Sequence, residues 1–159
     1  MCEEFQFLPQ MLSLNGEWHE VLARLYAVFC DDFKNGYPHH RQIRVIYNGI
    51  IKADGQGKEQ GFWHVISDET RTGVIHYPKA RRLPWAKPLM ECEERPEVKV
   101  WEYDEGTRDK GIRTYIWLEP GDYCVILQRK KACYFWVTAF HVDSEWKKSD
   151  LNRKYDERL

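Results

Sequence analysis

Residues 122–140 read DYCVILQRKKACYFWVTAF, two apolar runs on either side of a short basic segment. In both runs apolar residues occupy odd and even positions alike, a pattern typical of central strands that are covered on both faces. Residues 129–131, Arg-Lys-Lys, lie between the runs and predict the turn of a hairpin. The stretch therefore predicts two neighbouring strands, Tyr123–Gln128 and Ala132–Phe140, at the centre of a sheet.

Two more strands are expected before this hairpin. Val98–Tyr103 and Ile112–Leu118 are separated by the turn sequence DEGTRDKG, and a Pro-Gly pair at residues 120–121 leads into the next strand. Together with the hairpin they predict a β-meander. Apolar residues at positions 43–46 indicate one further short strand upstream.

A helix is expected toward each end of the chain. Asn15 can cap the first, which runs to about Asn35, because apolar residues recur there at three- and four-residue spacing and Asn35-Gly36 supplies a stop. Asp143 or Ser144 can cap the last helix, which has apolar residues on one side and alternating charges elsewhere.

The middle of the chain has a less regular pattern. Residues 61–69 read GFWHVISDE, and we interpret the aromatic part as a strand that carries His64. Residues 76–97 read HYPKARRLPWAKPLMECEERPE, and three prolines before Met90 exclude a long regular helix. This segment is expected to cross the surface as a short, irregular, basic stretch.

These elements predict a single α+β domain over residues 1–159. It consists of an N-terminal helix, an antiparallel sheet of about four or five strands and a closing helix. A chain of 159 residues is long enough to bury roughly two-thirds of its unfolded surface. Its content of 43% hydrophobic and 14% aromatic residues argues against disorder.

Charge and cysteine usage limit the partners and the compartment. A formal net charge of −1 gives no overall attraction to nucleic acid or to a membrane. Residues 71–90 nevertheless hold five basic residues and no acid, which indicates either a phosphate-binding surface or a solvated loop. There is no CxxC pair and no apolar run of membrane length, and the first residues carry acids where a signal peptide would be basic. We therefore expect a cytoplasmic protein.

The residue types available for chemistry are His, Arg, Lys, Thr and Tyr, together with the acid Glu91. A nucleophilic serine elbow, a glycine-rich phosphate loop and a carboxylate cluster suited to Mg²⁺ are all missing from the sequence. His39 and His40 are adjacent and point to different sides, so neither a metal nor another cofactor is predicted. This set suits metal-independent RNA cleavage, in which the ribose 2′-hydroxyl attacks its own phosphate with help from a base, an acid and cations.

Five stretches in a fixed order add a resemblance to a known family. They are FWHVIS, ARRLPWAKPLMEC, VKVWEY, DYCVILQRK and YFWVTAFHVDSEWKKSDLNRKYDERL. Together they resemble a phage-associated branch of the barnase/EndoU/colicin-D/RelE-like nucleases over about residues 61–159, with residues 1–60 as a less regular N-terminal part. The resemblance implies a helix packed on a curved antiparallel sheet, with an RNA-cleaving site on the concave face.

The resemblance also implies roles for individual residues. His64 matches an aromatic-His position, Arg81 and Arg82 match an arginine segment, Glu91 matches an acid after Trp-Pro, and Thr138 matches the Thr of Thr-Ala-Phe. Of the two arginines we prefer Arg82 for the site and assign Arg81 to clamping the RNA backbone. Glu91 is either a base or a residue that orients an arginine, and His64 is either catalytic or a satisfied core residue.

Several further residues complete the candidate site. His141 stands where the pattern often has another aromatic residue or proline, and it is either an additional acid/base group or a surface residue. Strand alternation places Thr138 on one side with Tyr134 and Trp136, where its hydroxyl either binds a phosphate oxygen or only satisfies β-propensity. The expected RNA contacts outside the catalytic set are Lys87, Arg113 and Lys130.

The first hypothesis is therefore a small, metal-independent endoribonuclease of toxin or phage type. Its substrate would be tRNA or mRNA, and an inhibitor or antitoxin protein would be a second partner. The alternative is a catalytically inactive module that binds RNA or protein on the same scaffold, and a third hypothesis is a structural phage-associated protein whose aromatics only pack. Whether His64 or His141 is the base or the acid stays open.

Overall fold

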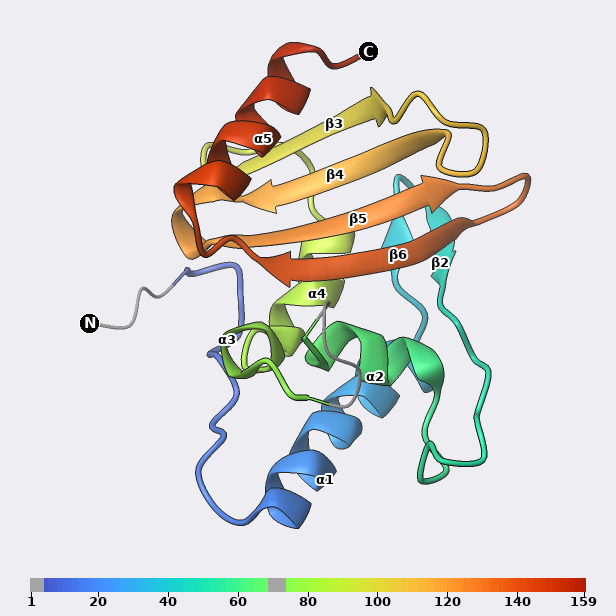
Figure 1. Ribbon diagram of the computed structural model, residues 1–159, viewed down its shortest axis with the longest axis vertical. Helices are drawn as coiled ribbons and strands as arrows, with labels where there is room; N and C mark the ends of the chain where they lie inside the picture. Colours follow the sequence, from blue (N-terminus) through green and yellow to red (C-terminus); the bar gives the residue numbers. More distant parts are fainter. Residues whose placement is uncertain (1–4, 69–73) are drawn as a thin grey trace.

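The computed structural model describes residues 5–68 and 74–159, so that Arg71 of the basic segment lies outside the described part. Its elements follow one another as α1 (Trp18–Phe29), η1 (Cys30–Lys34), β1 (His39–His40), β2 (Ile43–Ile46), α2 (Gln60–Ile66), α3 (Tyr77–Ala80), α4 (Leu83–Met90), β3 (Val98–Asp104), β4 (Ile112–Leu118), η2 (Glu119–Gly121), β5 (Tyr123–Arg129), β6 (Tyr134–His141) and α5 (Glu145–Asp156). The α+β class, with a helix toward each end and a sheet between them, is confirmed (Figure 1). None of the helices in these ranges has the length and hydropathy that crossing a membrane requires.

Six strands of the described residues form one curved sheet in the order β1-β2-β6-β5-β4-β3 (Figure 1). The four later strands pair antiparallel in chain order, which confirms the predicted meander. The strand count exceeds the predicted four or five because the β1–β2 hairpin joins at the edge. There β2 runs parallel to β6, with Val45 opposite Tyr134, so the sheet is mixed at this edge and not antiparallel throughout.

The sheet has a hydrophobic core on each face. On one face, helices α1 to α4 pack on the strands through a large cluster that includes Leu25, Leu89 and Val125. On the other face, α5 covers a smaller cluster that includes Trp117 and Leu151. Figure 1 shows α1 to α4 gathered at one end of the molecule, with α5 lying across the strands at the other. Both faces of β4 and β5 are therefore buried, as the unbroken apolar runs predict.

Helix α1 forms because its apolar residues recur at helical spacing and are buried from Val21 to Phe29. It begins at Trp18 and not directly after Asn15, because Gly16 takes a φ of 113°, which does not continue into a helix. A π-helical turn extends the helical region to Lys34, next to the predicted end at Asn35.

The interpretation of the aromatic part of residues 61–69 as a strand that carries His64 is wrong. Residues 60–66 form helix α2, in which Phe62, Val65 and Ile66 are buried at the i, i+3, i+4 spacing of a helix face. The same three residues also permit a strand when they are considered alone, because short apolar runs carry both periodicities. Buried Lys79 donates from Nζ to the carbonyl oxygens of His64, at 2.9 Å, and Ser67, at 3.1 Å, which stabilises the end of this helix.

The expectation that the proline-containing segment crosses the surface is also wrong. It forms the short helices α3 and α4, and Trp85, Leu89 and Met90 of α4 are buried in the large core. Pro78 and Pro84 lie in the first turns of these helices, where a missing N–H costs nothing. The prolines therefore divide the segment into two short helices, of which α4 is largely buried and α3 is buried at Lys79 and Ala80.

A β-bulge in β6 changes which side chains share a face. Leu127 of β5 lies opposite Trp136, but the preceding residue, Ile126, lies opposite Thr138, so that Val137 is the extra residue. Because directly opposed residues share a face, Thr138 lies with Ile126 on the α5 face, whereas Trp136 belongs to the core beneath α1 to α4. The predicted grouping of Thr138 with Trp136 is therefore wrong, since simple alternation does not account for a bulge.

Candidate functional site

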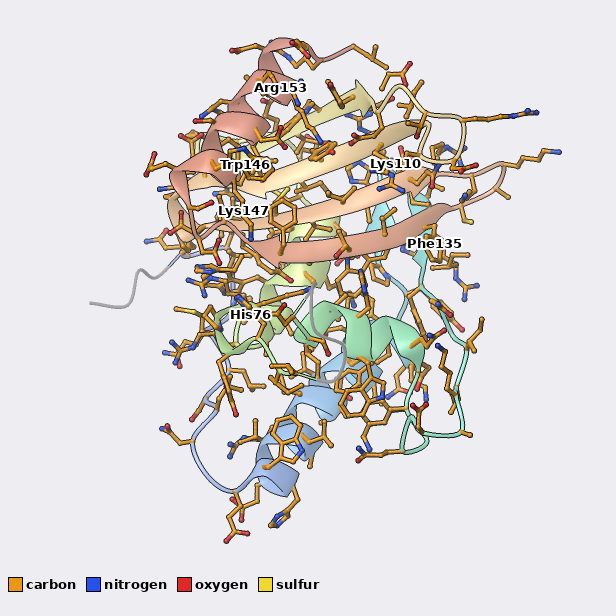
Figure 2. The ribbon with its side chains drawn as sticks, viewed as in Figure 1. His76, Lys110, Phe135, Trp146, Lys147 and Arg153 are labelled. Atoms are coloured by element: carbon orange, nitrogen blue, oxygen red, sulfur yellow. The ribbon has the colours of Figure 1, made fainter. Side chains whose placement is uncertain are left out.

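Three titratable side chains from separate segments meet at the end of β6. His76 directly precedes α3, His141 is the last residue of β6, and Asp143 lies between β6 and α5. One ligating atom of each lies within 4.8 Å of those of the other two, and the ring centroids of the histidines are 6.0 Å apart. With Arg82 and Lys147, described below, they form what we call the His76 cluster. Figure 2 shows His76 and Lys147 near the end of β6.

His76 is held in one orientation by the helix that follows it. Its Nδ1 accepts a hydrogen bond from the backbone N–H of Lys79, 3.2 Å away, so the side chain caps α3. Its own backbone N–H donates to the carbonyl of Ile66 at the end of α2. Because Nδ1 is an acceptor, the neutral ring carries its proton on Nε2, which lies 3.9 Å from a carboxylate oxygen of Asp143.

Arg82 places a fixed positive charge beside the histidines. Its Nε donates to the carbonyl of Gly121, at 3.1 Å, and its Nη1 donates to the carbonyl of Pro78, at 2.7 Å. These two bonds connect the turn before β5 to helix α3 and leave Nη2 as the nitrogen without a hydrogen bond in the described residues. The guanidinium is therefore preorganised, and its charge acts on His141.

His141 is poised as a neutral base. Burial lowers the pKa of its imidazole below the ordinary 6.5, and the nearby positive charge of Arg82 lowers it further. Its Nδ1 is buried without a hydrogen-bond partner in the described residues, whereas Nε2 is neither bonded nor enclosed there. The imidazole therefore keeps a nitrogen lone pair at neutral pH, and the reachable nitrogen is the one that can take up a proton.

Lys147 completes the cluster from the first turn of α5. Its Nζ lies 3.1 Å from a carboxylate oxygen of Asp143 and 3.4 Å from the carbonyl oxygen of His141. Partial burial of Asp143 would raise the pKa of its carboxyl, but the hydrogen bond and charge of Lys147 outweigh burial and lower it. Ser144 is the N-cap of α5 through a bond from the backbone N–H of Lys147, which fixes this first turn.

The cluster suits acid–base chemistry better than metal binding. Two imidazoles and a carboxylate are metal-ligand types. Coordination through Nε2 of His76, however, would place a proton on Nδ1, which would then face the N–H of Lys79 and break the cap of α3. Arg82 and Lys147 bring two positive charges to the cluster, next to the carboxylates of Asp143 and Asp122, and such cations can bind an anionic ligand such as a phosphate.

Comparisons of the chain with profiles of known families, with curated proteins and with solved structures gave no match. The resemblance inferred from the five stretches therefore stays a prediction.

Of the residues predicted from the sequence, Arg82 and His141 lie together in the cluster. His64 does not join them: it is exposed on α2 and lines a separate hollow of about 240 Å³ with Gln60 and Val137. Glu91 lines another hollow, of about 480 Å³, with His40 and Cys92 at the end of α4. The structure thus distributes these three predicted acid/base residues over three places.

Thr138 and Arg81 do not belong to the cluster, unlike Arg82 and His141. Thr138 faces the α5 side of the sheet, where its hydroxyl donates to the neighbouring carbonyl of Ala139, at 3.3 Å. Arg81 is exposed at the end of α3, and its carbonyl accepts a bond from the backbone N–H of Leu12. It is adjacent to Arg82 in the chain, so its charge stays near the cluster.

The three expected RNA contacts do not converge on the cluster. Lys87 lies on α4, where its charge lowers the pKa of Asp32, although burial raises that pKa overall. Arg113 lies within the sheet, between Tyr103 and Gln128. Lys130 lies beyond the other end of β5, roughly 20 Å from the His141 end at ~3.3 Å per residue.

Three members of the cluster were missed by sequence reasoning. His76 opens the basic segment, Asp143 was expected only as a helix cap, and Lys147 was treated as one charge of an alternating helix. No motif spacing connects these positions, because the cluster forms only when α3 packs against β6 and α5 begins directly after the strand. The one available signal was the presence of His141 and Asp143 two residues apart at a strand end.

Proposed function

We propose that the protein is a metal-independent endoribonuclease whose site is the His76 cluster. The observation that carries the proposal is the convergence of a neutral histidine, a second histidine and two cations at one strand end. This differs from the assignment drawn from the resemblance, because His76 and Lys147 take the places given there to His64 and Thr138. Arg82 and His141 are common to both.

In the proposed reaction His141 is the general base. Its Nε2 takes the proton of the ribose 2′-hydroxyl while the 2′-oxygen forms a bond to phosphorus and the bond from phosphorus to the 5′-oxygen breaks. The products are a 2′,3′-cyclic phosphate and a free 5′-hydroxyl, and neither water nor a metal ion enters this step. A low pKa suits this role because the imidazole must be unprotonated at neutral pH.

The remaining members of the cluster stabilise the negative charge of the transition state, protonate the leaving group and hold the phosphate. Arg82 supports the negative charge that develops on the phosphorane, because its guanidinium is fixed before substrate binds. Lys147, whose Nζ donates to the carbonyl of His141, supplies a proton to the 5′-oxygen. The Nε2–H of His76 donates a hydrogen bond to a phosphate oxygen and so holds the group in place.

Two further parts of the proposal concern setting and partners. A cytoplasmic location is supported by Cys30, Cys92, Cys124 and Cys133, which are not joined in disulfides. An inhibitor or antitoxin protein is the second proposed partner, and one that covered the His76 cluster would block access of RNA.

The proposal is tested by incubating the purified protein with a mixed-sequence RNA in the presence of EDTA. We expect cleavage that persists in EDTA and leaves 2′,3′-cyclic phosphate ends, detected by a terminal phosphate that alkaline phosphatase removes only after mild acid has opened the ring. Binding of RNA without cleavage would overturn the enzymatic proposal in favour of an inactive RNA-binding module. Cleavage only after addition of a divalent cation would overturn the assigned chemistry.

A further inference from the structure

Two exposed aromatic side chains adjoin the His76 cluster in the chain. Trp146, which directly precedes Lys147, is 74% exposed and is the most exposed large apolar side chain of the described residues. Tyr77, which directly follows His76, is 54% exposed. Within the described ranges neither ring contacts another ring or a cation. Both rings are therefore open to solvent, each directly next in the chain to a residue of the cluster.

Their backbone positions are fixed, which makes the two rings more than flexible surface residues. Trp146 lies in the first turn of α5, whose cap is the side chain of Ser144. Tyr77 is the first residue of α3, whose cap is the side chain of His76. The same hydrogen bonds that orient the cluster thus also hold the Cα atoms that carry these rings. Figure 2 shows Trp146 next to Lys147 at the start of α5.

Cations that can bind a nucleic-acid backbone lie nearby, together with the acids Asp122, Asp143 and Glu145. Arg82 and Lys147 belong to the cluster, and exposed Arg81 lies at the end of α3, four residues after Tyr77. Cations combined with exposed aromatic rings are the pattern by which proteins hold unpaired bases and their phosphates. Apolar contact alone would not require the cations, and phosphate binding alone would not require the rings.

We infer that the site takes single-stranded RNA, with bases flanking the reacting phosphate stacked on Tyr77 and Trp146. The inference rests on the proposed function and names its substrate class. In a duplex each base is stacked on its neighbours and paired, so the two rings could be used only after the duplex opens. Single-stranded segments present the faces of their bases at no such cost, and stacking on them tolerates any sequence.

The test separates binding from cleavage. A fluorescent 12-nucleotide RNA with 2′-O-methyl groups lacks the attacking hydroxyl, so its affinity is measured by anisotropy whether or not the protein is an enzyme. We expect W146A and Y77A each to weaken binding about 5- to 150-fold, the range given by stacking of one base. W146F should retain most of the affinity, and the same strand in a duplex should bind at least about tenfold more weakly.

Matched controls come from exposed aromatics elsewhere. Trp18, 41% exposed, lies on α1, which Figure 1 shows at the opposite end of the molecule from α5, and Tyr37 is 48% exposed beside Arg44. W18A and Y37A should bind as the wild type does, and circular dichroism should show all four alanine variants folded. Wild-type affinity in both W146A and Y77A, or equal affinity for duplex, would overturn the inference while leaving cleavage intact. Weakened binding in both variants without any cleavage would instead uphold the surface and defeat the proposed function.

Discussion

Two regions of the molecule hold a histidine among charged side chains, and they differ in whether the ring can be reached. In the hollow of about 480 Å³ beside α4, His40 is 1% exposed. Its Nδ1 is bonded to the carbonyl of Met90 at 2.8 Å, its Nε2 is enclosed without a partner in the described residues, and its ring packs edge-on against Tyr134. In the His76 cluster, by contrast, His141 keeps one ring nitrogen open.

The comparison shows that the size of a hollow does not identify a site. The hollow of about 480 Å³ contains His40 and Glu91, which the sequence suggested as a base, yet the ring of His40 is too enclosed to exchange a proton with a ligand. At His141 the surroundings are less enclosed, and burial and Arg82 together lower the pKa of a ring that remains reachable. Proton transfer requires a nitrogen that the ligand can reach, so we expect chemistry at His141 and a structural role for His40.

Replacement of His141 is expected to have the largest effect. His141→Ala removes the proposed base and should lower kcat/KM for RNA cleavage by about 10²- to 10⁴-fold. His64→Ala, on a different surface, should stay within about threefold of the wild type. The measurement is the initial rate on one RNA substrate at pH 7.5 with both variants confirmed as folded. A large loss in His64→Ala with little loss in His141→Ala would return the base to the histidine suggested by the resemblance.

The next largest effect is expected at Arg82. Arg82→Ala removes a preorganised donor and should lower kcat by about 100-fold. Arg82→Lys keeps the charge but not both carbonyl bonds, so its rate should lie between those of the alanine variant and the wild type. Because these bonds also connect α3 to the turn before β5, each variant's unfolding temperature must be recorded alongside its rate. Equal rates for lysine and alanine would show that charge is not what Arg82 contributes.

His40 should affect stability and not activity. His40→Ala leaves the carbonyl of Met90 without its donor and opens a cavity, which should cost about 1–3 kcal/mol in urea unfolding. Burial lowers the pKa of folded His40, so the unfolded chain binds the proton more tightly and the wild type loses stability as the pH falls below 6.5. This loss should be smaller in His40→Ala. A drop in kcat of the folded variant would contradict the contrast between the two regions.

The smallest effect is expected in the pH profile. A base must be unprotonated, so kcat/KM should fall as the pH drops through the pKa of His141, which lies below 6.5. Arg82→Gln removes a positive charge that disfavours the imidazolium and should move this acidic limb to higher pH. Asp143 and Asp122 raise the pKa of His141, whereas His76 lowers it as Arg82 does. Loss of Arg82 therefore removes only one of several charge effects on this pKa. The shift is measured by comparing the pH profiles of kcat/KM of the wild type and the variant, each normalised to its maximum. An acidic limb at the same pH in both proteins would show that His141 is not the titrating group.

The parts of the fold that the sequence predicted correctly are those with a clear local periodicity. The meander from β3 to β6 was predicted within two residues at each strand boundary because its strands are bounded by strong turn sequences. The helix at residues 60–66 was missed because three buried residues at i, i+3 and i+4 are too few to distinguish a helix from a strand. The parallel contact between β2 and β6 joins positions almost ninety residues apart, as Val45 and Tyr134 show, and no local pattern reports it.

Sequence analysis predicted only those residues of the site that could be selected individually, without knowledge of their neighbours in the fold. Arg82 and His141 were selected for their chemistry and for the resemblance, and both lie in the cluster. His76 and Lys147 could not be found in this way, because their role depends on the packing of α3 against β6 and on the start of α5 shortly after that strand. His76 is separated from His141 and Asp143 by strands β3 to β5 and most of β6 in sequence, whereas Lys147 lies four residues after Asp143.

The bulge at Val137 determines where the chain tolerates a change in length. If Val137 were deleted, Trp136 and Thr138 would keep their partners Leu127 and Ile126, and His141 would still face α3. One residue gained or lost between Thr138 and His141 would instead turn the imidazole to the α5 side and remove it from Arg82. We therefore expect β6 to tolerate the loss of one residue at the bulge, whereas the number of residues between Thr138 and His141 cannot change without displacing the imidazole.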